Sequence, residues 1–324
     1  MESYPIIGQE RLLKNLRKAL DQDELAHAYL LEGQKGLGKK EIAKWLATAI
    51  VCRGESPKPC HQCISCIKIN SNNHPEVKWI QEEGSIGIDI IRELQKDLQL
   101  KPYEGSKKVY IIDNAEKITL QAQNSLLKSL EEPPEYATII LLTNNGSSLL
   151  QTIISRCQRL KLLSVPLQEI EDYLVHTKKI DRNRAKVLAS LSNGVIGKAL
   201  QLSEDDEFQE RRSKVIQITR DILYAKEIEV LENIGFFQEE RDYIEEILET
   251  LVTWYRDLLI YKDTGKEEFL INIDNTTEIL QQSHKTSLDK IKRMIFTIEE
   301  TKHNLKANAN FQINIEVMLL NLTR

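Results

Sequence analysis

The sequence lacks any long apolar segment and any strong excess of one charge. No stretch approaches the ~18 consecutive apolar residues that a membrane-spanning helix needs. The first ten residues contain no basic segment followed by an apolar run, so we expect no signal peptide and a cytoplasmic location. A net charge of -5 argues against a strongly basic protein that coats nucleic acid, although a local basic patch could still contact DNA.

The composition is that of an ordinary globular protein. The 324 residues are 41% hydrophobic and 29% charged, which excludes intrinsic disorder and a collagen-like chain. This length predicts about two or three domains. Residues 1–165 carry 22 basic and 20 acidic side chains, whereas residues 166–324 carry 22 and 29. We therefore expect phosphate contacts in the first half and protein contacts in the acidic second half.

Apolar patterns change character at Pro166. Before it, strand-like runs alternate with helical spacing, which is typical of a parallel sheet in a three-layer α/β domain. The expected strands are 28–31, 109–112 and 138–142, with a further apolar run at 77–80, and the expected helices are one from about 9 and those at 38–51, 89–100 and 120–130. After Pro166 the pattern predicts short helices to about 202 and then long helices with apolar stripes.

Residues 33–40 read GQKGLGKK, which matches the front of the phosphate-binding loop G-x-x-x-x-G-K-[ST]. The loop falls between an expected strand and an expected helix, and its candidate nucleotide-binding residues are Gly33, Gly36, Gly38 and Lys39. Backbone N–H groups could curl around phosphate oxygens there, helped by the positive end of the helix. Lys40 stands where a Ser or Thr hydroxyl should bind Mg²⁺, which a protonated lysine cannot do. A loop degenerate for hydrolysis is favoured, nucleotide binding stays open, and a glycine-rich turn without a ligand is the alternative.

Asp113 ends an apolar strand, which is the pattern of the acid that holds Mg²⁺ in P-loop ATPases. The next position, where such ATPases carry a catalytic carboxylate, is Asn114, and an amide is not a useful proton acceptor. Glu116 lies two residues further on and is expected to face elsewhere. A plain strand-end cap is the alternative interpretation of Asp113. Defects in two separate motifs both predict weak or absent ATP hydrolysis.

Four of the five cysteines follow the spacing C-x7-C-x2-C-x2-C, namely Cys52, Cys60, Cys63 and Cys66. Four thiolates suit a tetrahedral Zn²⁺ ion, and a ligand set that is already full predicts a structural site rather than a catalytic one. An iron–sulfur cluster is the minority alternative. Neighbouring His61 is expected to be exposed, and Cys157, which stands apart, is expected to be a buried thiol.

The order of these motifs resembles that of the AAA+ clamp-loader subunits of bacterial DNA polymerase III. The segments that carry the resemblance are IGQ at 7–9, HAYLLEG at 27–33, the four cysteines, NSLLK at 124–128, LEEPP at 130–134 and SRC at 155–157. The resemblance covers residues 1 to about 200 by motif, and the rest by helical character and length. It implies an α/β AAA+ P-loop domain at 1–165 with a zinc module at 52–66, an all-α lid at 166–205 and an all-α collar for oligomerisation at 206–324.

The resemblance also implies a partner complex. In this family tau/gamma motor subunits, a delta subunit and a further subunit form a pentamer that opens the beta sliding clamp and closes it on primed template DNA. The complex belongs to the polymerase holoenzyme, a nucleotidyltransferase. Motor subunits are expected to have Ser or Thr after the loop lysine, an Asp-Glu pair and a lid arginine, whereas this chain has Lys40, Asn114 and Gly197.

These departures imply a subunit with little or no ATP hydrolysis of its own. By resemblance, Arg156 is an arginine finger that reaches the ATP and Mg²⁺ bound by a neighbouring subunit. Two other functions stay open. An active ATPase of the tau/gamma type would hydrolyse ATP in a way that depends on Lys39. A zinc module that binds nucleic acid directly would need zinc for DNA binding, although 52–66 lacks a recognition helix.

Overall fold

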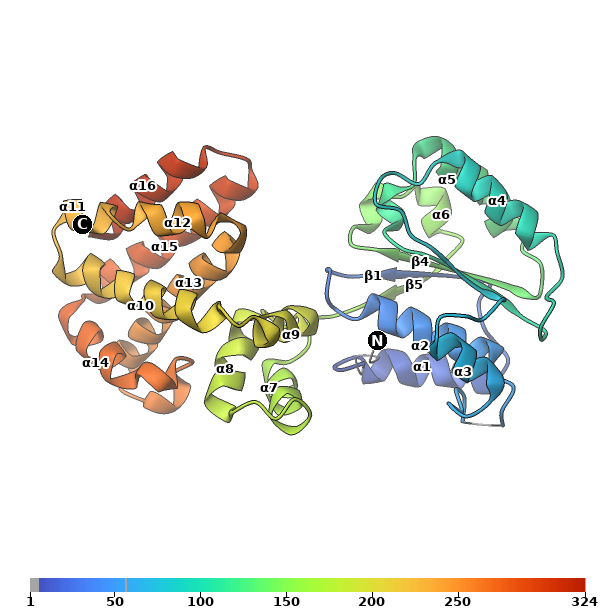
Figure 1. The fold of residues 1–324 in the computed structure, drawn as a ribbon, viewed down its shortest axis with the longest axis horizontal. Helices are drawn as coiled ribbons and strands as arrows, with labels where there is room; N and C mark the ends of the chain where they lie inside the picture. Colours follow the sequence, from blue (N-terminus) through green and yellow to red (C-terminus); the bar gives the residue numbers. More distant parts are fainter. Residues whose placement is uncertain (1–5, 56, 324) are drawn as a thin grey trace. The chain divides into compact units, whose positions relative to one another are not determined.

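The structure is a computed structural model that describes residues 6–55 and 57–323 and forms two compact units (Figure 1). Unit 1 comprises Met1–Pro166 with Val195–Gly197, and unit 2 comprises Leu167–Gly194 with Lys198–Arg324. The first five residues, on which the expected absence of a signal peptide partly rests, lie outside the described residues. Within the described part of the chain, no helix is long and apolar enough to cross a membrane.

Unit 1 contains a five-stranded parallel sheet, which confirms the α/β prediction. Its strands are β1 (Ala28–Glu32), β2 (Val77–Ile80), β3 (Lys108–Ile112), β4 (Ala137–Thr143) and β5 (Gln158–Lys161), and they lie in the order β2-β3-β4-β1-β5. The central strand β4 is buried along its whole length. The edge strand β5 has no apolar run, since its sequence is QRLK and three of its residues are exposed, and periodicity therefore gave no sign of it.

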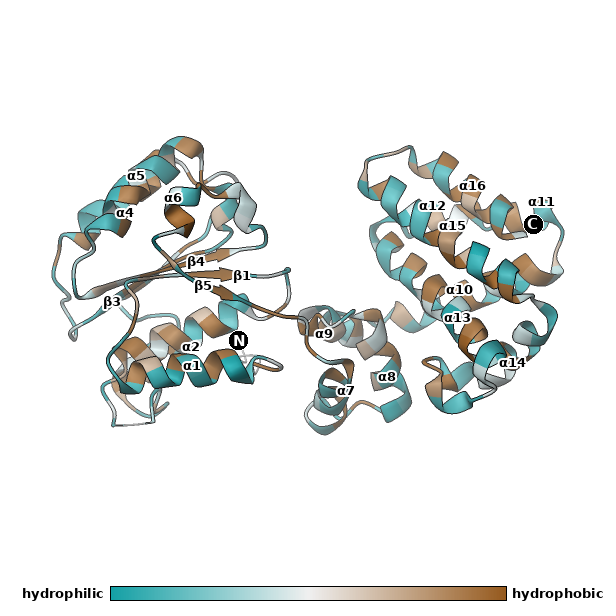
Figure 2. Ribbon diagram, turned by 180° about the vertical axis from the view of Figure 1, so that it is seen from behind, coloured by the Kyte–Doolittle hydropathy of each residue, from teal (hydrophilic) through white to brown (hydrophobic). Residues whose placement is uncertain are grey.

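Helices cover both faces of the sheet, as Figures 1 and 2 show. One layer contains α1 (Glu10–Asp21), α2 (Lys39–Val51) and α3 (Ile64–Asn70), and the other contains α4 (Ile88–Leu98), α5 (Leu120–Glu131) and α6 (Gln151–Ile154). Side chains alternate along β1, so Tyr29 and Leu31 join the core under α1 and α2, whereas Leu30 joins the core under α4 and α5. The sheet therefore separates two apolar cores.

Unit 2 consists of helices, in agreement with the predicted all-α second half. They are α7 (Leu167–His176), α8 (Arg182–Leu191), α9 (Ile196–Glu204, whose first two residues belong to unit 1), α10 (Phe208–Tyr224), α11 (Glu227–Leu231), α12 (Ile234–Glu239), α13 (Ile244–Thr264), α14 (Thr276–Lys285), α15 (Leu288–Lys306) and α16 (Phe311–Thr323). Apolar stripes of α13 and α15 pack together with α16 in one core. The division of this half into lid and collar stays a prediction.

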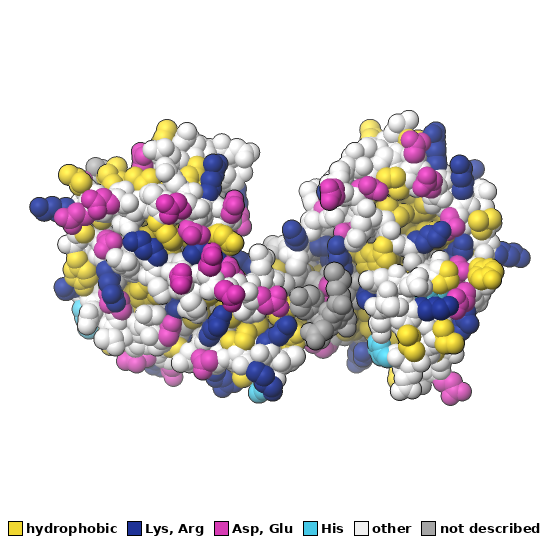
Figure 3. All heavy atoms as spheres, viewed as in Figure 1, with side chains coloured by type: hydrophobic (Ala, Val, Ile, Leu, Met, Phe, Trp, Pro, Cys, Tyr) yellow, Lys and Arg dark blue, Asp and Glu magenta, His cyan; other side chains and the backbone are white. Residues whose placement is uncertain are grey.

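The acidic excess of the second half does not gather into one patch on the face drawn in Figure 3. Acidic and basic side chains are interspersed over unit 2 in that view. Several of them form ion pairs, such as Lys302 with Glu249 at 2.7 Å and Arg212 with Asp274 at 2.6 Å. Much of the charge of unit 2 is therefore compensated within the unit.

Asp257 is a fully buried carboxylate that fixes the segment after α13. It accepts hydrogen bonds from the backbone N–H groups of Ile271 and Asn272 at 2.9 and 2.7 Å, and from the Asn272 side chain at 2.9 Å. Arg256 lies 2.8 Å from its other oxygen. The carboxylate therefore satisfies backbone N–H donors of a segment that lies outside the helices.

We predict that Asp257→Ala lowers the free energy of unfolding by about 2–4 kcal/mol, because buried N–H donors lose their acceptor. Urea unfolding of the full chain, followed by far-ultraviolet circular dichroism, measures the change. The matched control is Asp263→Ala, which removes an exposed carboxylate from the same helix and should change stability by no more than about 0.5 kcal/mol. Equal effects of the two variants would contradict the assignment.

Candidate functional site

The loops that follow β1, β3 and β4 meet at one edge of the sheet, because parallel strands have their carboxyl ends on the same side. Strands β1 and β4 end in register, with Glu32 opposite Thr143. Gly33 donates its N–H to the Thr143 carbonyl at 3.2 Å. This register places the phosphate loop beside Asn144, the first residue after β4.

Lys39 is folded back onto its own loop. Its ammonium group donates to the carbonyl oxygens of Gly33 and Gln34 at 2.6 and 2.9 Å, and to Oδ1 of Asn144 at 2.8 Å. An ammonium has three donors, so these contacts occupy all of them. Burial lowers the pKa of Lys39, while the nearby carboxylates of Glu116 and Asp113 act in the opposite direction. A phosphate group would have to displace these acceptors.

Lys40 forms an ion pair with Asp113. The two side chains approach to 2.9 Å between Nζ and Oδ2, and the side chain of Asp113 is only 7% exposed. Asn114 donates from Nδ2 to the same oxygen at 3.1 Å. The two residues that depart from the ATPase motifs therefore both contact the carboxylate that would hold a metal ion, one as a cation and the other as an amide.

Glu116 belongs to the same network, so the expectation that it faces elsewhere is wrong. Its carboxylate accepts from the side-chain amide of Asn144 at 2.6 Å and from the backbone N–H of Asn144 at 3.3 Å. The chain turns back because Asn114 has a left-handed φ of 51° and leads into the 3-10 turn η1 (Ala115–Lys117). Sequence reasoning also missed the role of Asn144, for which the only signal is the run Thr143-Asn144-Asn145 at the end of β4.

The start of α9 touches the phosphate loop. Gly197 donates its N–H to the Gly36 carbonyl at 2.9 Å, and a Cβ built at Gly197 would lie 2.9 Å from the Cα of Gly36. Any side chain at position 197 would therefore force the loop or the helix to move. Gly36 and Gly38 both have a positive φ, at 89° and 90°. The loop is thus held in a conformation that only these glycines adopt without strain.

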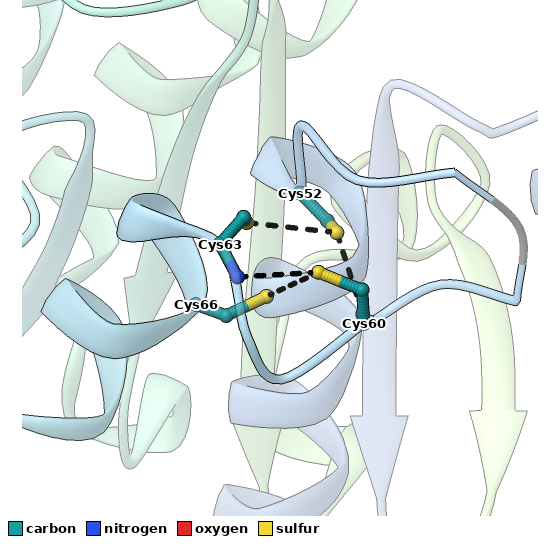
Figure 4. Close-up of side chains that lie close together, drawn as sticks. All are labelled: Cys52, Cys60, Cys63 and Cys66. Atoms are coloured by element: carbon teal, nitrogen blue, oxygen red, sulfur yellow. Dashed lines mark hydrogen bonds between the residues drawn. The ribbon is translucent and has the colours of Figure 1, made fainter.

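The four cysteines converge as their spacing predicts (Figure 4). All four sulfur atoms lie within 4.8 Å of one another, and the Cys52–Cys63 and Cys60–Cys66 sulfur pairs are both 3.9 Å apart. Four sulfurs around a tetrahedral zinc ion at about 2.3 Å would be about 3.8 Å apart. The cluster could therefore hold a metal ion such as zinc.

Backbone hydrogen bonds favour the thiolate form of Cys63, whereas burial raises the pKa of Cys66. Burial alone would raise the pKa of Cys63, but hydrogen bonds from the backbone of Cys66 and Arg53 lower it to about 6. Close packing adds a constraint that spacing did not reveal. A Cβ at Gly54 would lie 2.5 Å from the Cys60 sulfur, so this position beside the cluster has no room for a side chain.

Arg156 follows α6 by two residues, and its side chain lies beside Glu131, the last residue of α5. Its Nη1 donates to the Thr152 carbonyl at 2.9 Å, and its Nη2 lies 2.6 Å from Oε1 of Glu131. Among the described residues it has no hydrogen bond or ion pair with the phosphate loop or Asp113. Cys157, next in the chain, is half-buried against the core under α4 and α5, and burial raises its pKa to about 12.

Known proteins match this chain over nearly its whole length. A family model described as DNA polymerase III, delta subunit matches residues 8–166, and one described as the C-terminal part of that subunit matches residues 206–324. DNA polymerase III subunit delta' of Bacillus subtilis is 35% identical, and the match covers 97% of this chain and 96% of that protein. Subunit tau of the same organism is 27% identical over 98% of this chain and 60% of its own length.

A solved structure of a gamma subunit-related protein from Thermotoga maritima aligns with 96% of this chain and 99% of its own. Its identity is 19% and its TM-score 0.40, too low to bear on function. The parallel sheet with its phosphate loop, the helical second half and the two family matches together define an AAA+ clamp-loader subunit. Within that class, the chain belongs to the delta-prime family of DNA polymerase III subunits.

Metal binding by the cysteine cluster is testable on the full chain. We predict that protein purified with zinc present holds about one ion per chain, and that Cys66→Ser loses most of it because three thiolates leave the tetrahedron open. Elemental analysis by mass spectrometry measures the content. Cys157→Ser is the matched control and should keep its metal, because Cys157 lies outside the cluster. Equal metal loss in both variants would contradict the assignment.

Proposed function

We propose that this delta-prime-type chain is the stator of a clamp loader that loads the beta sliding clamp onto primed template DNA. In this proposal it assembles with tau/gamma and delta subunits in the cytoplasm. Residues 206–324 form the collar, residues 166–205 the lid, and residues 1–165 the nucleotide fold. The full-length match to a delta-prime subunit and the matches to tau/gamma subunits support this assembly.

The chain does little or no ATP hydrolysis in this proposal. The observation that carries it is the ion pair of Lys40 with Asp113 at 2.9 Å. In a P-loop ATPase a hydroxyl at position 40 would bind Mg²⁺ together with the acidic strand end. Here the ammonium of Lys40 contacts the carboxylate of Asp113. A metal ion would therefore have to displace this ammonium and would be repelled by its charge nearby. Asn114 adds a second defect, since no carboxylate follows Asp113 to accept a proton.

Arg156 serves the neighbouring site in this proposal. Its side chain is 35% exposed, and it belongs to the Ser-Arg-Cys segment that the family resemblance identified. A guanidinium stays protonated and can fork onto two phosphate oxygens, which suits charge that develops during phosphoryl transfer. ATP and Mg²⁺ would be held by the adjacent motor subunit, and this chain would contribute only the arginine.

Zinc would have a structural role. All four sulfurs would be used by the ion, leaving no open coordination position for a substrate or water. The loop that precedes α3 has few apolar residues to bury, so the ion would replace a hydrophobic core in holding it.

We predict that the isolated chain shows no ATP hydrolysis above background, because the metal-binding carboxylate is already paired with Lys40. A coupled assay of phosphate release, with and without DNA, measures the rate. The competing function, an active motor subunit of the tau/gamma type, predicts the opposite result. Turnover by the isolated chain that Lys39→Ala abolishes would establish that competing function and contradict ours.

We further predict that Arg156→Ala silences one ATP site of the reconstituted complex with tau/gamma and delta subunits. An arginine finger is worth about 10³–10⁵ in rate at its own site, so total DNA-stimulated ATPase should fall by roughly a third or more if one site of three is lost. Size-exclusion chromatography should show an intact complex. Arg92→Ala, which removes an exposed arginine from α4, is the control and should leave the rate unchanged. An unchanged rate in Arg156→Ala would show that this arginine is not a finger.

A further inference from the structure

We propose that Glu131 is a positioning residue for Arg156, holding one side of the guanidinium so that the rest can engage phosphate. This inference rests on the proposed role of Arg156 as a finger. The carboxylate Oε1 lies 2.6 Å from Nη2, and the Thr152 carbonyl accepts from Nη1 at 2.9 Å. Two acceptors from different elements thus fix the plane of the guanidinium.

The two side chains start from rigid positions. Glu131 is the last residue of α5, a helix anchored by the buried side chains of Leu126 and Leu130 and followed by two prolines. Arg156 follows α6, whose Ile153 is buried in the same core. A carboxylate on one element and a guanidinium on the other therefore meet with little freedom to drift apart.

A buried amide connects these two elements. Gln123 of α5 is 4% exposed, and its Oε1 accepts from the backbone N–H of Leu150 at 2.8 Å. Its Nε2 donates to the carbonyl of Ile118 at 3.0 Å. These hydrogen bonds fix the segment that enters α6 against α5, so the distance between Glu131 and Arg156 is set by the fold and does not depend on the ion pair alone.

The arrangement leaves donors for a second ligand. A guanidinium has five N–H donors, and the contacts to Glu131 and Thr152 involve only Nη1 and Nη2. The Nε–H has no partner among the described residues. A side chain as flexible as arginine loses much rotamer freedom when it grips a ligand, and ordering it beforehand reduces that loss. Glu131 is 49% exposed, so solvent screens its repulsion toward a phosphate.

The test measures the Arg156-dependent ATPase of the reconstituted complex, defined as the wild-type rate minus the rate with Arg156→Ala. Glu131→Ala should lower the kcat of this part about tenfold and leave the KM for ATP unchanged, because a misplaced finger weakens only the transition state. Glu131→Gln, which keeps an acceptor oxygen at the same place, should restore much of the rate. Adding Glu131→Ala to Arg156→Ala should have no further effect.

Glu132→Ala is the matched control, since it removes the adjacent exposed carboxylate and should leave kcat unchanged. A normal rate in Glu131→Ala would overturn the inference, as would a faster rate, which would mean that the carboxylate competes with phosphate. An additive loss in the double variant would also overturn it. If Arg156→Ala itself has no effect, the proposed finger fails instead, so the two failures are distinguishable.

Discussion

The alignment of strand ends at the carboxyl edge of the sheet controls the chemistry of the phosphate loop. Because β1 and β3 both pair with β4 in parallel, the phosphate loop comes within hydrogen-bonding reach of Asp113 and Asn144. Once they meet, however, they satisfy each other. Lys39 donates its three hydrogen bonds to carbonyl and amide oxygens, and Lys40 forms an ion pair with the buried carboxylate of Asp113. The phosphate loop and the acidic strand end therefore form an internally paired network.

The pairing of Lys40 with Asp113 differs from the arrangement in an ATPase site. An ATPase site needs an empty position for a cation beside the acidic strand end and unpaired donors in the loop. Here the ammonium of Lys40 contacts the carboxylate of Asp113 instead. The close approach of Gly197 to Gly36 removes space for a side chain over the loop. In the function proposed above, the contacts of Lys40 and Asn114 with Asp113 are the two features that work against hydrolysis.

A second candidate functional feature of unit 1 lies away from this network. The segment around Arg156 is built on α5 and α6, which pack on the opposite face of the sheet from α2. Its partly exposed guanidinium contacts Glu131 and Thr152, neither of which has a hydrogen bond to the phosphate loop in the described part of the chain. In the function proposed above, a lack of hydrolysis in the chain's own site would leave the arginine undisturbed, because Arg156 has no hydrogen bond or ion pair with that site among the described residues.

The periodicity of apolar residues predicted much of the fold, but it missed elements that form mainly through contacts with distant segments. Buried strands and amphipathic helices appear as apolar runs and stripes, so β1, β3, β4 and the long stripes of α13 and α15 were predictable. The edge strand β5 was not, because its strand character comes from pairing with β1. Helix α3 was not predicted either, since its residues Ile64–Asn70 lie within and after the cysteine loop and its packing partner is α2.

The sequence alone determined the chemistry of the site, because it fixes which donor types are present. The cysteine spacing, and the replacement of hydroxyl, carboxylate and arginine at positions 40, 114 and 197, can be seen without any coordinates. Only the tertiary structure decided what those side chains do. Lys39 and Asn144 are 105 positions apart, and their contact, like that of Lys40 with Asp113, depends on strand register. The sequence shows which side chains are present at each position. Which distant side chains contact one another depends on how the parallel strands and their crossover helices pack.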